Sequence, residues 1–441
     1  MYSICKSEIR AGVSLTCITT DKFKSSCITF NLLCGLEKET AGANALLSRV
    51  LRRGSASLPD MESITAALDD LYGVRIEPII RKKGEIQCIG FYVDFPDDRY
   101  IPGGESIAES AVKILADILL SPCLQEGLLR EDYIESEKSN LIDDIRAGIN
   151  DKRGYSVDRL LEEMCAGEAF GVSKLGDEER VREITCKSLT EHYYNIIANS
   201  RIEILYCGSI SPQRVDAMIR HAFSGLSDRT EPNIPKTDVV YDPHLNEPRR
   251  FSETLDVTQC KLVAGFRIGD AMKTPDYPAF MMFNALYGGS VSSKLFLNVR
   301  ERLSLCYYAS SMLDKHKGIM LVTSGVEFSN AEIALNEILA QLENIKSADI
   351  TELEFTSAKR SIMTSIRSAL DRSGGLEELY FDSVLSAVTY NPAELCSMID
   401  DVTVERVIKA SSGIKLDSVY LLSGTEDIEI TESKETDDDA K

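Results

Sequence analysis

Histidine, cationic stretches and long apolar runs are all scarce in this sequence. Four histidines occur among the 441 residues, and no two of them are close enough to share one helical turn. They are His192, His221, His244 and His316. Zinc sites and acid–base triads depend on imidazole groups. The scarcity therefore argues against a histidine-based metal or catalytic site within this chain.

Charge and hydropathy exclude two classes of partner. The chain has 49 lysines and arginines against 70 aspartates and glutamates, a net charge of −21, and no basic stripe offsets it. A field of this sign repels phosphate backbones. No run of about 18 apolar residues is present to span a membrane, and the first residues lack the charged-then-apolar order of a signal peptide. We expect a cytoplasmic protein that binds neither nucleic acid nor a membrane.

Cysteine is plentiful but shows no metal-binding pattern. The twelve cysteines include no Cys-x-x-Cys pair, and most lie within apolar runs, as Cys27 and Cys207 do. Free, buried thiols are the expected state of such residues in the cytoplasm. Apolar residues make up 44% of the chain, which is typical of a globular protein. At about 100–200 residues per domain, the length predicts two or three domains.

Prolines divide the chain into two parts. They interrupt both helical and strand periodicity among charged and polar residues, so we interpret residues 227–251 as a linker. The interruptions are at Pro232, Pro235, Pro243 and Pro248. Domains are then expected at 1–226 and 252–425. Residues 426–441 are strongly acidic with few apolar groups, which predicts a disordered, solvated tail.

The two domains end in the same order of elements. A helix at 189–197 precedes a glycine-closed strand at 202–208, and a helix at 402–410 precedes a similar strand at 418–424, which suggests a duplication. Apolar patterns predict further strands at 27–34, 84–95, 261–266 and 319–326. Helical patterns predict helices at 60–72, 106–120, 128–145, 330–345 and 350–370. Strand clusters followed by long helices indicate α+β halves, each a sheet covered on one face by helices.

A long motif in the second half gives the sequence a family resemblance. It reads Gly288-Gly289-Ser290-Val291-Ser292-Ser293-Lys294-Leu295-Phe296-Leu297-Asn298-Val299-Arg300-Glu301-Arg302-Leu303-Ser304-Leu305-Cys306-Tyr307-Tyr308. It resembles the C-terminal half of the pitrilysin/insulinase-type (inverzincin) peptidases, which include mitochondrial processing peptidase. The resemblance extends over nearly the whole chain. It implies a metallopeptidase-like duplicated domain: an α+β fold of two homologous halves, each with an antiparallel-rich sheet.

The zinc-binding residues of the active family members are missing. Those members carry His-x-x-Glu-His on a helix of the first half, where two imidazoles bind the metal and the glutamate takes a proton from the metal-bound water. Aligning Arg53-Gly54-Ser55 with the family's Lys-Gly-Thr places Ala45, Ser48 and Arg49 at the three functional positions. None of them can fill its role, and the neighbouring arginines disfavour a dication. The chain itself is therefore expected to hold no metal.

A downstream helix resembles the family segment that supplies the last zinc ligand. Glu137 and Asp144 stand where the family has glutamates seven residues apart, and both would lie on one helix face. Asp144 maps to the lost ligand, although it is one methylene shorter than glutamate. Ordinary carboxylates on an exposed amphipathic helix are the interpretation we favour, with a metal site as the alternative. The segment Ser188-Leu189-Thr190-Glu191-His192 mimics the motif, but it falls in another helix and offers a poor ligand set.

Arg300 and Tyr307 are the positions that the resemblance marks as functional. In the family, an arginine and a tyrosine at this spacing contact backbone carbonyls of the substrate near the metal of the facing half. Guanidinium and phenol groups are fixed donors that can orient a peptide carbonyl and stabilise an oxyanion. Ser304 replaces the family's usual glycine, which puts the loop geometry in question. Gly288 and Gly289 fit either a turn, which we favour, or a short form of the glycine-rich substrate loop of the non-catalytic subunit of processing peptidase.

Loss of the zinc ligands beside retention of the Arg/Tyr pair defines the functional prediction. The family includes heterodimers in which one subunit keeps the zinc motif and the other keeps only this pair. The resemblance therefore implies a non-catalytic subunit of a heterodimeric zinc metallopeptidase that processes peptides, with no peptidase activity on its own. Its partner would be a motif-bearing pitrilysin-family subunit of the YmfH type, which would carry the zinc. The alternative is a catalytically silent scaffold or interaction protein of the same fold, in which the pair is a relic.

Overall fold

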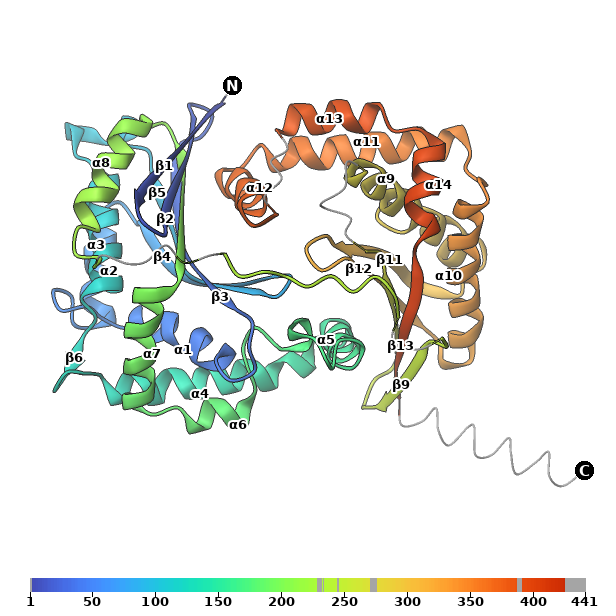
Figure 1. Cartoon of the computed structure of the whole chain (residues 1–441), viewed down its shortest axis with the longest axis horizontal. Coiled ribbons are helices and arrows are strands. Elements are labelled where there is room, and N and C mark those ends of the chain that lie inside the picture. The colour runs from blue at the N-terminus through green and yellow to red at the C-terminus, as the bar shows by residue number, and fades with distance from the viewer. Residues whose placement is uncertain are drawn as a thin grey trace, which may run out of the picture. The chain divides into compact units, whose positions relative to one another are not determined.

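The structure is a computed structural model that describes residues 2–227, 232, 234–243, 246–269, 276–386 and 391–424 (Figure 1). The chain forms two compact units. The first comprises Met1–Arg146, Val172–Lys236 and Ser368–Ala387, and the second comprises Ala147–Gly171, Thr237–Arg367 and Val388–Lys441. Each unit therefore includes a segment from the other half of the sequence. The predicted tail at 426–441 and part of the predicted linker at 227–251 lie outside the described residues.

A six-stranded sheet forms the centre of the first unit, in the order β1-β2-β8-β3-β5-β4. Its strands are β1 (Tyr2–Arg10), β2 (Val13–Thr20), β3 (Ser25–Gly35), β4 (Arg75–Lys83), β5 (Ile86–Pro96) and β8 (Arg201–Gly208). Neighbouring strands pair antiparallel, except β2 and β8, which are parallel. The strands predicted at 27–34, 84–95 and 202–208 are confirmed.

Helices from the first half of the chain pack against one face of this sheet. They are α1 (Ala41–Leu51), α2 (Met61–Asp70), α3 (Ile107–Leu120), α4 (Glu131–Ala147), α7 (Cys186–Asn199) and α8 (Pro212–Ala222). The unit also contains α6 (Glu178–Glu183) and the short strands β6 (Leu124–Gln125) and β7 (Leu128–Leu129). The local sequence of α2 shows why a helix forms there: Asp60 and Ser63 cap its start reciprocally, and Gly73 adopts a φ of 76° just beyond its end. The helices predicted at 60–72, 106–120 and 128–145 are confirmed.

A helix from the second half of the chain covers the other face of the same sheet. Tyr380 and Phe381 of α12 (Ser373–Ser386) lie in an apolar cluster with residues of β2, β3, β5 and β8. In the same interface Arg81 Nη1 lies 3.0 Å from Glu377 Oε1, and the Thr29 hydroxyl donates to that oxygen over 2.8 Å. Burial raises the pKa of Glu377 even though these two donors favour its charged form.

The second unit repeats this topology with five strands, in the order β11-β12-β10-β13-β9. They are β9 (Arg249–Thr254), β10 (Cys260–Arg267), β11 (Cys306–Asp314), β12 (Ile319–Val326) and β13 (Lys415–Ser423). β13 lies between a parallel neighbour, β9, and an antiparallel neighbour, β10, as β8 lies between β2 and β3. The order β9-β13-β10-β12-β11 therefore matches β2-β8-β3-β5-β4, which establishes the internal duplication.

Helices also cover both faces of the second sheet. On one face the core includes α9 (Tyr277–Tyr287), α10 (Ala331–Lys346), α11 (Glu352–Ala369), α13 (Pro392–Asp400) and α14 (Val404–Ser412). On the other face lies α5 (Lys152–Met164), which comes from the first half of the chain and brings Leu160 and Met164 against Val263 and Tyr420. A Cβ on Gly265 would lie 2.5 Å from Met164 Sδ, so a larger residue there would force the Met164 side chain to move. The two halves thus exchange helices, which the sequence patterns did not predict.

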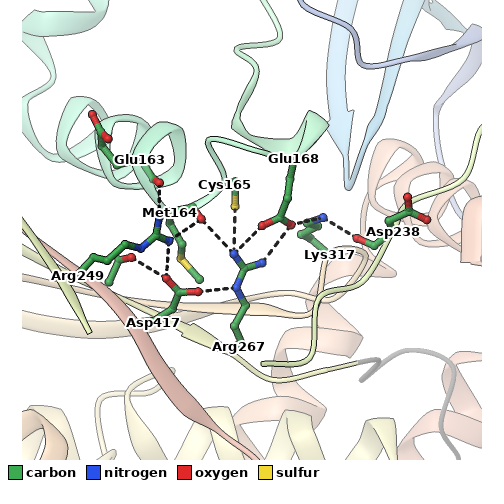
Figure 2. Close-up of polar contacts among 10 residues, drawn as sticks. Glu163, Met164, Cys165, Glu168, Asp238, Arg249, Arg267, Lys317 and Asp417 are labelled. Atoms are coloured by element: carbon green, nitrogen blue, oxygen red, sulfur yellow. Dashed lines mark hydrogen bonds and ion pairs between the residues drawn. The ribbon is translucent and has the colours of Figure 1, made fainter. Parts of the chain in front are cut away.

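Buried charges hold the exchanged segment in the second unit (Figure 2). Arg267 is fully buried, and its guanidinium donates to Glu168 over 2.6 Å and to Asp417 over 2.9 Å. Lys317 lies 2.6 Å from Glu168, and Arg249 lies 2.7 Å from Asp417, so each carboxylate contacts two cations. Burial raises the pKa of both carboxyl groups, but hydrogen bonds from the cations outweigh it and leave each pKa below its usual range.

The remaining boundaries agree with the patterns in the sequence or extend them. The helices at 330–345, 350–370 and 402–410 are confirmed. β9 begins at Arg249, inside the region predicted as a linker. Over the part of the chain that the structure describes, none of the helices is both long and apolar enough to cross a bilayer.

Candidate functional site

The degenerate zinc motif lies on α1, where its side chains pack instead of presenting ligands. Ala45 is fully buried, and Ser48 is 2% exposed. The Ser48 hydroxyl has no hydrogen-bond partner among the described residues. A methyl group and an isolated hydroxyl supply neither the imidazole nor the carboxylate that zinc requires, so this helix does not fit a zinc ion.

Arg49 and Asp144, the positions of the second histidine and the distal ligand, form an ion pair. Arg49 Nη2 lies 2.7 Å from Asp144 Oδ2. Just beyond the end of α1, Arg53 Nη1 lies 3.1 Å from Glu137 Oε1, so a second ion pair joins this part of the chain to α4. At the place where the resemblance puts a metal ion between two helices, the guanidinium groups of Arg49 and Arg53 form ion pairs with the carboxylates of Asp144 and Glu137. The predicted shared face of Glu137 and Asp144 is therefore directed at α1.

A polar network beside the motif contains His192, which the sequence analysis set aside as a zinc ligand. His192 Nε2 lies 2.7 Å from Asn44 Oδ1, and because an amide oxygen only accepts, Nε2 carries the proton. Asn44 in turn donates to Gln87 Oε1 over 2.8 Å. Burial lowers the pKa of His192 and so favours its neutral form. Among the residues described by the structure, no three metal-ligating side chains come together.

Arg300 lies on the π-helix η5 (Leu295–Arg302), which is anchored in the second core by Leu295 and Val299. The guanidinium carbon lies 4.7 Å from the centre of the Phe296 ring, a cation–π contact that favours this placement of the side chain. Its Nε is 3.6 Å from Glu301 Oε1, which is too long for a hydrogen bond. The side chain is 41% exposed. Its donors are therefore available to a ligand.

The turn after η5 has the backbone conformation that glycine favours, even though serine occupies it. Ser304 has a φ of 52°, a left-handed conformation that costs a non-glycine residue about 1–2 kcal/mol. Leu305 N donates to Val299 O over 3.0 Å and closes the turn. The loss of the family's glycine has therefore not removed a left-handed turn from this loop.

Tyr307 projects from a β-bulge. The register between β11 and β12 shifts between Cys306 and Tyr308, so Tyr307 has no partner residue on β12. Its side chain is 60% exposed, and its hydroxyl donates to Glu327 Oε1 over 2.5 Å. This hydrogen bond to a carboxylate raises the pKa of Tyr307.

Close packing accounts for both glycines of the motif. Gly288 N and Gly289 N both donate to Asn284 O at the end of α9. A Cβ on Gly288 would lie 2.6 Å from Ser311 N, and one on Gly289 would lie 2.6 Å from the Asn284 amide nitrogen. These contacts support the turn interpretation, and contact of either glycine with a substrate stays a prediction.

The structure thus brings the predicted positions together in two groups, one in each unit. Ala45 and Ser48 are buried on α1, Arg49 of the same helix pairs with Asp144 of α4, and Arg300 and Tyr307 flank one turn. Sequence reasoning missed two contacts, those of Asn44 with His192 and of Tyr307 with Glu327. Glu327 directly follows the strand that pairs with β11, but the second contact also depends on the bulge at Tyr307, which no periodic pattern in the sequence announces.

Comparison with known proteins identifies the family. Residues 183–362 match the family model described as Peptidase M16 inactive domain. The chain is 32% identical over 418 residues to the Probable inactive metalloprotease YmfF of Bacillus subtilis (strain 168). The aligned region covers 94% of this chain and 96% of that protein.

Solved structures agree with this match. A conserved protein from Enterococcus faecalis V583 has a TM-score of 0.86 at 26% identity over 96% of this chain and 98% of that chain. A peptidase M16 inactive domain from Pseudomonas fluorescens shares the fold, with a TM-score of 0.78 at 14% identity over 96% of this chain and 98% of that chain. The long match to YmfF and the replaced zinc ligands lead to one conclusion. The chain belongs to the M16, or pitrilysin, family of peptidases, as one of its non-catalytic members.

Proposed function

We propose that this chain is the non-catalytic subunit of a heterodimeric zinc metallopeptidase that processes peptides. A second subunit of the same family, of the YmfH type, supplies the zinc and the catalytic glutamate. The observation that carries the proposal is a contrast within the chain. The Arg49–Asp144 ion pair stands in place of zinc ligands, whereas Arg300 and Tyr307 stay exposed around an intact left-handed turn. We also propose that the protein is located in the cytoplasm.

The role of this chain in the assembly is to bind and orient the peptide. Arg300 carries several N–H donors in a fixed plane, and charge-assisted donation to a backbone carbonyl would hold that carbonyl and draw electron density toward its oxygen. When the carbonyl is attacked, the same donors stabilise the oxyanion. The zinc of the partner activates the attacking water. Tyr307 supplies a second contact to the peptide backbone.

The first test is reconstitution. Peptidase activity on a quenched-fluorescence peptide library and zinc content are measured for this chain, for a motif-bearing partner and for their equimolar mixture. We expect activity in the mixture well above that of the partner alone. A mixture that forms a complex but is no more active than the partner would favour the scaffold alternative over the proposal.

The second test uses variants of this chain in the active mixture. Arg300→Ala should lower kcat/KM by about 10²-fold, the typical effect of removing one oxyanion donor, and Tyr307→Phe should lower it to a smaller extent. Arg302→Ala is the matched control. Arg302 is on the same helix, its side chain is 64% exposed, and its nearest carboxylate, Glu337, is 3.9 Å away. Equal losses for Arg300→Ala and Arg302→Ala would contradict the proposal.

A further inference from the structure

The contact between Tyr307 and Glu327 limits what the tyrosine can do. A phenol has one proton to donate. In this structure that proton is donated to Glu327 Oε1 over 2.5 Å. While this bond exists, the Tyr307 hydroxyl has only lone pairs left for another group. It therefore cannot donate to a peptide carbonyl at the same time.

The fold places the two side chains together. Cys306 pairs with Val326 at the end of the β11–β12 hairpin, and the bulge leaves the next residue, Tyr307, without a partner on β12. Glu327 directly follows Val326, so both side chains leave the hairpin at the same end. Both are exposed, which leaves the bond open to competition from a ligand or from water.

We propose that Glu327 is a positioning residue that restrains Tyr307, and that a peptide carbonyl must displace the Glu327 carboxylate to receive the phenol proton. The inference deepens the proposed function and rests on it. In the exchange no covalent bond is formed or broken: the hydroxyl turns from one acceptor to another, and Glu327 is left to solvent. The carboxylate orients the phenol before the peptide arrives, and it also weakens binding.

The chemistry of glutamine makes a direct test available. In Glu327→Gln the side chain keeps its size, loses its charge and gains an N–H₂ group. That group can donate to the phenol oxygen and hold the ring, and the phenol proton is then free for the peptide. Glu332→Gln is the matched control, because Glu332 is an exposed carboxylate of the second unit that pairs with Arg250.

The first arm of the experiment uses this chain alone. The protein is labelled with ¹³C at the Cζ atom of tyrosine and titrated by NMR, and Tyr307→Phe assigns the resonance of Tyr307. We expect the pKa of Tyr307 to fall in Glu327→Gln and to stay unchanged in Glu332→Gln. An unchanged pKa in Glu327→Gln would show that the contact does not restrain the phenol, and the inference would be overturned.

The second arm uses the active mixture with the partner. Glu327→Gln should lower KM about threefold to tenfold, the range expected when one competing hydrogen bond is removed, with little change in kcat. Glu332→Gln should leave both constants as they are. A KM that stays the same or rises in Glu327→Gln would overturn the restraint while leaving the proposed function intact. A mixture without any gain in activity would instead refute the proposed function, and the inference with it.

Discussion

The buried charges around Arg267 make the sharpest prediction about stability. Arg267→Met replaces a fully buried guanidinium side chain with a shorter, unbranched apolar side chain. Glu168 and Asp417 then each keep one cation, Lys317 and Arg249 respectively. The substitution leaves two carboxylates in a buried environment with about half of their compensation.

The expected loss follows from this arrangement. Breaking a buried ion pair by removing one partner costs about 3–5 kcal/mol. Because Lys317 and Arg249 remain, we expect the lower end, a loss of about 3 kcal/mol in the free energy of unfolding. Arg249→Met is the comparison. It removes one partner of Asp417 and two bonds to backbone carbonyls from a side chain that is 23% exposed, and it should cost about 1–2 kcal/mol.

Urea unfolding followed by far-UV circular dichroism measures both losses, since the chain has no tryptophan for a fluorescence signal. Limited proteolysis adds a local readout. Arg267→Met should make residues 147–171 more sensitive to cleavage, because Glu168 belongs to that segment. Equal losses for the two variants, or a loss below about 1 kcal/mol for Arg267→Met, would refute the role assigned to the buried charges.

Three further predictions concern the candidate site. Ser304→Gly should raise the free energy of unfolding by about 0.5–1 kcal/mol, because glycine accepts the left-handed backbone without strain; a destabilised variant in urea unfolding would contradict this. Arg49→Ala should change stability by less than about 1 kcal/mol, since Asp144 is mostly exposed, and a large loss in the same assay would mean that the ion pair matters for folding. Burial lowers the pKa of His192, so the unfolded state binds the proton more readily and stability should fall as pH drops below about 6.5, the usual histidine pKa. His192→Gln should reduce that dependence in unfolding curves measured at several pH values, and identical pH profiles would contradict the assignment.

The sequence predicted two sheets, each covered on one face by helices, but it did not predict the exchanged helices α12 and α5 that cover the other faces. Apolar periodicity located strands such as 84–95 and helices such as 106–120, because one face of each element is buried. It could not assign α5 and α12 to the sheets of the opposite halves. An apolar stripe shows that a helix face is buried and does not show which sheet buries it. That choice depends on long-range packing, such as the fit of Met164 over Gly265.

The sequence also predicted only part of the candidate site, because an alignment locates residues but does not give the local backbone conformation. The motif alignment found Arg49 and Asp144, and the structure shows them 2.7 Å apart. The alignment left the loop at Ser304 in question, because a backbone angle cannot be read from residue type alone. The bond from Tyr307 to Glu327 depends on a bulge in one hairpin, and no periodic pattern announces a bulge.

The most direct test of the account is a titration of a motif-bearing partner with this chain, with peptidase activity and bound zinc measured at each ratio. We predict that peptidase activity rises to a plateau at an equimolar ratio and that the amount of bound zinc depends only on the amount of partner. Peptidase activity that does not change with the amount of this chain, or bound zinc that increases in proportion to this chain, would contradict the central claim.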